Sequence, residues 1–313
     1  MKAKTIKAVI RKKIDEWLAT IEDKEVREKA ATGTIVTGGC IASMLLREKV
    51  NDFDIYFKDK ATATAVADYY VKRFQPQKRR GIPCKIHVDG AGDRVRIIIK
   101  SAGVASEDGT EKEYQYFESR PDGEASEYIS EIMRDPGDIA DTQEATQGAA
   151  LDVVDDGKPR YRPVFMSTNA ITLSHRIQIV LRFYGMPDEI HENYDYVHCT
   201  SYWTSWDEDL VLKPGALEAL LTRELRYVGS KYPICSLIRM RKFINRGWTI
   251  NAGQVLKMAM QVSQLNLSDP AVLEDQLTGV DVAYFMEVLA KVKEGDPEKV
   301  SSAYLIEIID RMF

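Results

Sequence analysis

The sequence predicts an α+β fold in which a small mixed sheet, flanked by helices, is followed by an all-helical C-terminal domain. Three observations favour this class. Short runs rich in β-branched and aromatic residues alternate with helical periodicity up to about residue 213. One compact strand–turn–helix–strand unit occupies residues 31–57. From about Leu217 onward only helical periodicity remains. We therefore expect two domains, 1–213 and 214–313, which meet near Lys213-Pro214-Gly215.

The N-terminal elements can be predicted from local patterns. Residues 1–30 are expected to be helical, because Ile6, Ile10 and Ile14 recur at helical spacing. The elements expected next are a strand at 34–36, a helix at 40–49, a strand at 51–57 and a helix at 61–74. Strand-like runs follow at 84–88 and 95–100.

Residues 101–160 differ from the rest of the chain. They are rich in Glu, Asp, Gly and Ser, and we interpret them as an acidic insertion with one helical turn or two at Tyr128–Met133. The elements expected afterwards are strands at 164–166, 170–173, 177–183 and 194–199, with a short helix at 188–193. The helices expected in the C-terminal domain span 215–227, 235–246, 251–264, 270–277, 279–293 and 297–312.

Composition excludes several classes of protein. An apolar content of 44% and a charged content of 29% are typical of a soluble globular protein. No apolar run approaches the roughly 18 residues that a membrane span needs, so we expect no membrane partner. The scattered cysteines (Cys40, Cys84, Cys199 and Cys235) indicate a reducing cytoplasm, which is the host cytoplasm if the protein is viral. The net charge of −5 disfavours a large basic nucleic-acid surface.

The motif with the most chemical content joins a diglycine turn to two carboxylates. Thr37-Gly38-Gly39 ends the first strand, and Asp52 and Asp54 lie on the next one. Glycines let a backbone approach a ligand closely, and the following helix N-terminus offers N–H groups to a triphosphate. Carboxylates at i and i+2 of a strand share a face, where they can hold two Mg²⁺ (or Mn²⁺) ions about 3.5–4 Å apart. A plain turn and a solvated edge strand are the alternative interpretations.

This spacing resembles the signature of the DNA polymerase beta-like nucleotidyltransferase superfamily, in which Gly-Gly or Gly-Ser precedes Asp-apolar-Asp/Glu. The segment is also similar to the start of tRNA CCA-adding enzymes and poly(A) polymerases. It departs from them at Ala42-Ser43, where many of those enzymes carry Arg-Asp. The resemblance implies transfer of a nucleoside monophosphate from a nucleoside triphosphate (NTP) to a hydroxyl acceptor. It implies that Asp52 and Asp54 are the catalytic metal ligands.

The resemblance also implies a third carboxylate on a later strand next to the Asp-x-Asp strand. The best match is Asp195, on the strand expected at 194–199, which would complete the acceptor-side metal site and assist deprotonation. The stretch from Arg176 to this aspartate resembles the matching region of viral and phage-type nucleotidyltransferase-like proteins. Asp89 and Asp93 are rival candidates, but they flank a Gly-Ala-Gly turn and are typical of hairpins.

Further candidates for contact with the nucleotide join Gly38 and Gly39. The hydroxyl of Ser43 is expected in the first turn of the helix after the glycines, where a capping or solvated serine is the alternative. Arg239 and Lys242 share a face of a basic helix, which could clamp a triphosphate or be simply solvated. Lys231 lies just upstream as another candidate phosphate ligand.

Two functional hypotheses follow from these residues. The first is a Mg²⁺-dependent nucleotidyltransferase whose acceptor is an RNA or tRNA 3′ end, a protein or a small molecule. The second is a non-catalytic protein, for example of a virus, that keeps the same fold for assembly or regulation. A P-loop hydrolase is excluded, because no Lys-Ser/Thr follows the glycine turn.

Overall fold

We describe a computed structural model of the chain. It describes residues 1–50, 52–73, 84–90, 92, 94–101, 115–116, 118–119, 160–167, 169–269, 272 and 276. Most of the insertion at 101–160, including the helical turn expected at 128–133, lies outside these residues. So do the helices expected at 279–293 and 297–312 and most of the helix expected at 270–277.

The N-terminal helical stretch consists of two helices, α1 (Ala3–Ala19) and α2 (Lys24–Gly33). Helix α1 buries one face, formed by Ile6, Ile10, Ile14 and Trp17. Asp23 starts α2, since its side chain accepts a hydrogen bond from the backbone N–H of Val26 at 3.1 Å. The cap explains why the expected single helix is divided here.

The predicted strand–turn–helix–strand unit is confirmed. Strand β1 (Thr34–Thr37) leads through the glycines into α3 (Gly39–Leu46), and β2 (Phe53–Phe57) follows. Helix α4 (Lys60–Arg73) begins after Asp59, whose carboxylate accepts from the N–H of Thr62 at 2.7 Å. Helix α3 ends earlier than expected, because Arg47 adopts the left-handed conformation with φ +62°.

The remaining strands complete one large sheet and one small one. They are β3 (Cys84–Asp89), β4 (Arg96–Ser101), β5 (Gln115–Tyr116), β6 (Glu118–Ser119), β7 (Pro163–Ser167), β8 (Ala170–Leu173), β9 (Ile177–Tyr184), β10 (Tyr202–Thr204) and β11 (Leu210–Val211). The eight-stranded sheet has the order β11-β10-β1-β2-β9-β8-β7-β6, and β3-β4-β5 form a second sheet. Strands β2 and β9 pair in parallel, whereas the other pairs of the large sheet are antiparallel. The α+β class with a mixed sheet is thus confirmed.

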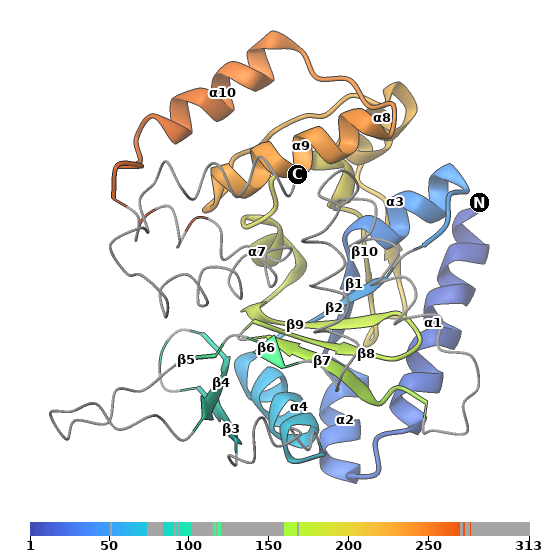
Figure 1. Cartoon of the computed structure of the whole chain (residues 1–313). Helices are drawn as coiled ribbons and strands as arrows, with labels where there is room; N and C mark the ends of the chain where they lie inside the picture. Colours follow the sequence, from blue (N-terminus) through green and yellow to red (C-terminus); the bar gives the residue numbers. More distant parts are fainter. Residues whose placement is uncertain are drawn as a thin grey trace, which may run out of the picture.

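The two faces of the large sheet have different roles. Figure 1 shows α2 and α4 packed along one side of the strands, with α9 and α10 at the far end of the molecule. The face toward α1, α2 and α4 forms the main core, to which Val36, Ile55 and Ile179 contribute. The opposite face carries a smaller apolar cluster of Ile35, Tyr56, Val180 and Ile190. The polar residues of β2 lie on this second face, because side chains alternate along a strand.

The segment before β10 contradicts the expected strand at 194–199. Helix α7 (Pro187–His191) is followed by a single bridge between Tyr196 and Tyr227, and then by the 3₁₀ turn η2 (Val197–Cys199). The N–H of Val228 donates to the carbonyl of Asp195 at 2.9 Å, so this segment pairs with the loop after α8 and not with the sheet. The local sequence pattern was therefore not enough to predict which segment these residues pair with.

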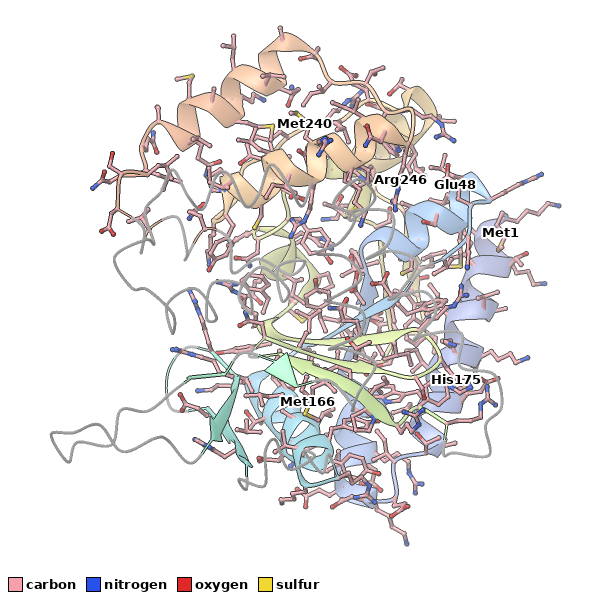
Figure 2. The ribbon with its side chains drawn as sticks, in the orientation of Figure 1. Met1, Glu48, Met166, His175, Met240 and Arg246 are labelled. Atoms are coloured by element: carbon pink, nitrogen blue, oxygen red, sulfur yellow. The ribbon has the colours of Figure 1, made fainter. Side chains whose placement is uncertain are left out.

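The C-terminal part is helical in the described residues. It contains α8 (Pro214–Thr222), α9 (Pro233–Asn245) and α10 (Ala252–Val262). These helices share an apolar cluster with α3, formed by Ala42, Tyr196, Leu220, Leu225, Tyr227, Trp248 and Met258. Arg223, just after α8, donates to Glu48, just after α3, at 2.8 Å and to the carbonyl of Arg246, at the end of α9, at 3.4 Å. Figure 2 shows Glu48 and Arg246 near each other.

No helix among the described residues combines the length and the apolar character needed to cross a bilayer. The boundary expected near Pro214 coincides with the start of α8. The separate domain expected at 214–313 stays a prediction.

Candidate functional site

The glycine turn between β1 and α3 is shaped around an aspartate. Gly38 has φ +94° and ψ −151°, a conformation that L side chains rarely adopt. A Cβ at this position would lie 2.8 Å from Oδ2 of Asp54 and 3.5 Å from the hydroxyl of Tyr194. The backbone N–H of Gly38 donates to the carbonyl of Cys199 at 3.2 Å, which fixes the turn. Glycine is therefore required here both for its conformation and for the space it leaves.

The next residue faces open space. A Cβ on Gly39 would meet no described atom within 4 Å. Gly39 is the first residue of α3, whose first turn contains no acidic side chain and whose N-cap, Gly38, provides no side-chain hydrogen bond. Backbone N–H groups of a helix N-terminus without such caps are suited to bind an anion.

Asp52 and Asp54 converge on one side chain of the neighbouring strand. Gln178 on β9 lies directly opposite Asp54 in the parallel pairing with β2. In the orientation that gives both ends of its carboxamide suitable partners, the nitrogen donates to Oδ1 of Asp54 at 3.2 Å and to Oδ2 of Asp52 at 3.3 Å. The two carboxylates are thus held close together, half-buried, beside the glycine turn. Gln178 lies in the strand predicted at 177–183, but nothing in the sequence gives a reason to assign it to the site.

Neutral side chains, some buried and some half-buried, lie close to this pair. Tyr56, Tyr194, Cys40 and Cys199 lie near it, and burial raises the pKa of each above its ordinary value. The negative charge of Asp54 raises each pKa further. These side chains therefore stay uncharged at neutral pH. A wall of neutral groups lowers the local dielectric and strengthens the attraction between the carboxylates and a cation.

A hydrogen-bond network that was not predicted from the sequence joins Thr37, which precedes the glycine turn, to His191 and Lys213. Thr37 pairs with Asp54 across β1 and β2, and its hydroxyl donates to the carbonyl of Ser201 at 2.9 Å. That hydroxyl also lies 2.8 Å from Nε2 of His191. Since its one proton is already donated, Nε2 carries the ring proton. Nδ1 then accepts from Lys213, which lies 3.3 Å away.

This histidine is neutral in the folded protein. Burial lowers the pKa of His191 to about 4, and the charge of Lys213 contributes to the shift. Its partner Lys213 also donates to Asp188 at 2.7 Å. The signal available in the sequence was the short helix at 188–193, but the contact with Thr37 depends on tertiary packing.

Asp195 does not occupy the position that the sequence predicted. It lies outside the sheet, just before η2, and Arg239 of α9 donates to its Oδ2 at 2.6 Å. Its side chain is 11% exposed and that of Arg239 is 28% exposed, so the pair is largely shielded from water. The charges of Asp195 and Asp54 both raise the pKa of Cys199, so Cys199 lies near both carboxylates. The predicted strand was wrong, and the role of Asp195 as a metal ligand stays a prediction.

The donor set suits a divalent cation only in part. Two carboxylates with an amide beside them are oxygen donors of the kind that Mg²⁺ and Mn²⁺ prefer. Across the described residues, however, no three His, Cys, Asp or Glu side chains gather in an arrangement that could hold a metal. The expected set of three carboxylates is therefore not assembled in this structure, whereas the pair of Asp52, just before β2, and Asp54, on β2, fits a cation.

The other residues predicted to contact the nucleotide lie on different elements. Ser43 is in the second turn of α3, not the first, because the helix begins at Gly39. Lys242 is half-buried one turn after Arg239 on α9. Lys231 lies at the rim of a surface cavity of about 410 Å³, and its ammonium is 5.8 Å from the centre of the Phe183 ring. Their roles toward a nucleotide stay predictions.

The departure at Ala42 has a structural reason. This side chain is only 5% exposed and packs in the cluster shared by α3 and the C-terminal helices, with Leu220 and Trp248. A charged residue at this position would be buried in an apolar environment, which is costly without a partner. An arginine is therefore incompatible with the way this chain packs.

Comparison with known proteins identifies the family. The model of one protein family, described as Gad2, Gabija anti-defense 2 family protein, matches residues 8–223. The chain belongs to the Gabija anti-defense 2 family. The matched region contains the glycine turn, Asp52, Asp54, Gln178 and Asp195, and it ends before Arg239. A comparison with curated proteins found no match.

Solved structures with a similar trace include enzymes that act on tRNA. A Thermotoga maritima CCA-adding enzyme complexed with tRNA has 12% identity and a TM-score of 0.37, with 88% of this chain and 53% of that chain covered. A Bacillus stearothermophilus CCA-adding enzyme in complex with CTP has 12% identity and a TM-score of 0.37, with 89% and 52% covered. A tRNA-processing enzyme with CTP has 11% identity and a TM-score of 0.39, with 86% and 55% covered. The chain spans about half the length of these proteins.

Proposed function

We propose that this chain is a Mg²⁺-dependent nucleotidyltransferase whose activity counteracts the Gabija defence. The family description supports the biological role. The observation that carries the chemistry is the contact between the glycine turn and the carboxylate pair, in which Oδ2 of Asp54 lies 2.8 Å from where a Gly38 Cβ would be. A phosphate at the start of α3 would therefore be adjacent to two metal-binding carboxylates.

Each part of the site has a defined task in this proposal. The N–H groups at the start of α3 bind the triphosphate, and the open space at Gly39 lets it approach the backbone. Asp52 and Asp54 hold Mg²⁺ or Mn²⁺. The bound cation supplies Lewis-acid polarisation of the phosphate and lowers the pKa of the acceptor hydroxyl.

The reaction is a single displacement at phosphorus. The acceptor oxygen forms a bond to the α-phosphorus of the NTP, and the bond from that phosphorus to the bridging oxygen breaks. Pyrophosphate leaves with the bonding electrons. The hydroxyl proton passes to a carboxylate of the pair or to water. The products are a nucleotidylated acceptor and pyrophosphate.

Arg239 and Asp195 lie near the carboxylate pair, since their charges and that of Asp54 all act on the pKa of Cys199. We propose that the guanidinium of Arg239 binds a phosphate of the NTP while Asp195 holds it in place. Lys242, which is one turn after Arg239 on α9, and Lys231 would add positive charge for the triphosphate or the acceptor. The acceptor we propose is an RNA, such as a tRNA end, or a protein hydroxyl of the defence system.

The test is transfer of label from α-labelled NTPs in the presence of Mg²⁺ or Mn²⁺. Acceptors are total tRNA and the purified Gabija proteins, and the products are separated by gel. The wild type should label one acceptor, and Asp52→Asn and Asp54→Asn should label none. Equal labelling by the wild type and both variants would refute the proposed activity.

Two observations favour a second candidate, a non-catalytic member of the fold that acts by binding. Asp195 is engaged with Arg239, and the described residues contain no group of three potential metal-ligating side chains. Such a protein would bind a Gabija component with the same affinity in Mg²⁺ and in EDTA. It would also counteract the defence equally well with Asp54→Asn, whereas a nucleotidyltransferase would lose both the activity and the counter-defence.

A further inference from the structure

Gln178 lies beside both carboxylates of the proposed metal site. It lies opposite Asp54 in the parallel β2–β9 pairing, and its side chain is half-buried on the face that carries the two carboxylates. Its amide nitrogen is 3.2 Å from Asp54 and 3.3 Å from Asp52. One end of this carboxamide therefore contacts both groups that we propose as metal ligands.

The amide has two ends of nearly equal shape and opposite character. Its nitrogen donates to carboxylates, and its oxygen is a ligand for hard cations such as Mg²⁺, Mn²⁺ and Ca²⁺. A half-turn about the Cγ–Cδ bond exchanges the two ends and leaves the backbone unchanged. Without a cation, the oxygen would face only the oxygens of Asp52 and Asp54, which disfavours that orientation.

We infer that Gln178 is a third ligand of the divalent cation held by Asp52 and Asp54, and that its carboxamide turns over when the cation binds. This inference rests on the proposed function of the carboxylate pair. The neutral amide keeps the charge of the three ligands at that of two carboxylates, which one dication balances.

The test is Mn²⁺ binding to the full chain, followed by the electron paramagnetic resonance signal of free Mn²⁺. The variants are Gln178→Glu, Gln178→Leu and Asp54→Asn. Thr172→Val is the matched control, because Thr172 pairs with Gln178 from β8, one strand further from the carboxylates. Gln178→Leu should weaken Mn²⁺ binding about tenfold or more, and Gln178→Glu should strengthen it by a similar factor. The control should bind like the wild type.

A second readout covers the case in which Gln178→Leu fails to fold. In EDTA, Gln178→Glu should unfold at a lower temperature than the wild type, because three carboxylates repel one another. Saturating Mn²⁺ should remove this difference. If Gln178→Glu binds Mn²⁺ like the wild type and gains no extra stabilisation from it, while Asp54→Asn loses binding, Gln178 is not a ligand and the proposed function stands. If Asp54→Asn also binds like the wild type, the carboxylate site itself is wrong.

Discussion

Gly38 and Asp54 share a space that admits only one side chain. Oδ2 of Asp54 lies 2.8 Å from the position that a Cβ on Gly38 would take. Gly38 follows β1 directly, and Asp54 lies in the neighbouring strand β2. The left-handed φ of +94° adds a second requirement for glycine at this point. The turn and the carboxylate therefore form one structural unit.

Gly38→Ala should damage both stability and binding. The new Cβ would clash with Asp54 and would be strained at φ +94°, so we expect a loss of about 1–3 kcal/mol in the free energy of unfolding. The measurement is urea unfolding followed by circular dichroism. The displaced carboxylate should also bind Mn²⁺ more weakly.

Gly39→Ala is the matched control for the backbone. Its Cβ meets no described atom, and alanine favours a helix over glycine by about 1 kcal/mol, so the protein should fold at least as stably as the wild type. It should nevertheless bind nucleotide more weakly, because the methyl group fills the approach to α3. Equal stability of the two alanine variants would contradict the geometry described for the turn.

The pair of Asp195 and Arg239 should contribute to stability through coupling. Arg239→Met leaves the shielded carboxylate without its charged donor, and we expect a loss of about 1.5–3 kcal/mol in the free energy of unfolding. Arg241→Met, which changes an exposed arginine of the same helix, should cost less than about 0.5 kcal/mol. A double-mutant cycle with Asp195→Asn measures the coupling, and a value near zero would show that the contact is not formed in solution.

Two buried histidines should make the protein sensitive to acid. Burial lowers the pKa of both His191 and His198 to about 4, whereas each has an ordinary pKa of 6.5. Between these values the unfolded chain binds more protons than the folded one. These histidines therefore do not lower the free energy of unfolding above about pH 6.5, and they lower it increasingly as the pH decreases toward 4. Urea unfolding at pH 7.5, 6.0 and 5.0 measures the slope.

His198→Phe separates one of these contributions. The ring of His198 packs against Phe243 and Trp248, with centroid distances of 4.6 and 4.3 Å, and neither ring nitrogen has a hydrogen-bond partner in the described structure. Phenylalanine should keep this packing and remove the proton-linked loss, which is on the order of 3 kcal/mol at pH 4. An unchanged pH dependence in this variant would assign the acid sensitivity to other groups.

Much of the sheet, the glycine turn and the two carboxylates could be predicted from the sequence, because they depend on residues close together in the chain. Strand β1, the diglycine turn and strand β2 follow one another directly, so glycine conformation and strand alternation were enough to predict that Asp52 and Asp54 share a face. The helices α9 and α10 followed equally from their periodicity.

The rest of the site depends on contacts between distant segments. Asp195 was expected on a strand at 194–199, but its segment pairs with the loop at Tyr227 instead. Gln178 acquires its importance only from the parallel register of β2 and β9, which no local pattern specifies. The contact between His191 and Thr37 likewise appears only after α7 has packed against the end of β1.

The most direct test of the central claim is calorimetric titration of a non-hydrolysable NTP analogue into the wild type and Asp54→Asn. Asparagine keeps the shape of the side chain beside Gly38 and removes its charge. We predict binding to the wild type in Mn²⁺, no detectable binding in EDTA, and no detectable binding to Asp54→Asn under either condition. The same affinity for both proteins, with and without metal, would contradict a divalent-cation nucleotide site at the glycine turn.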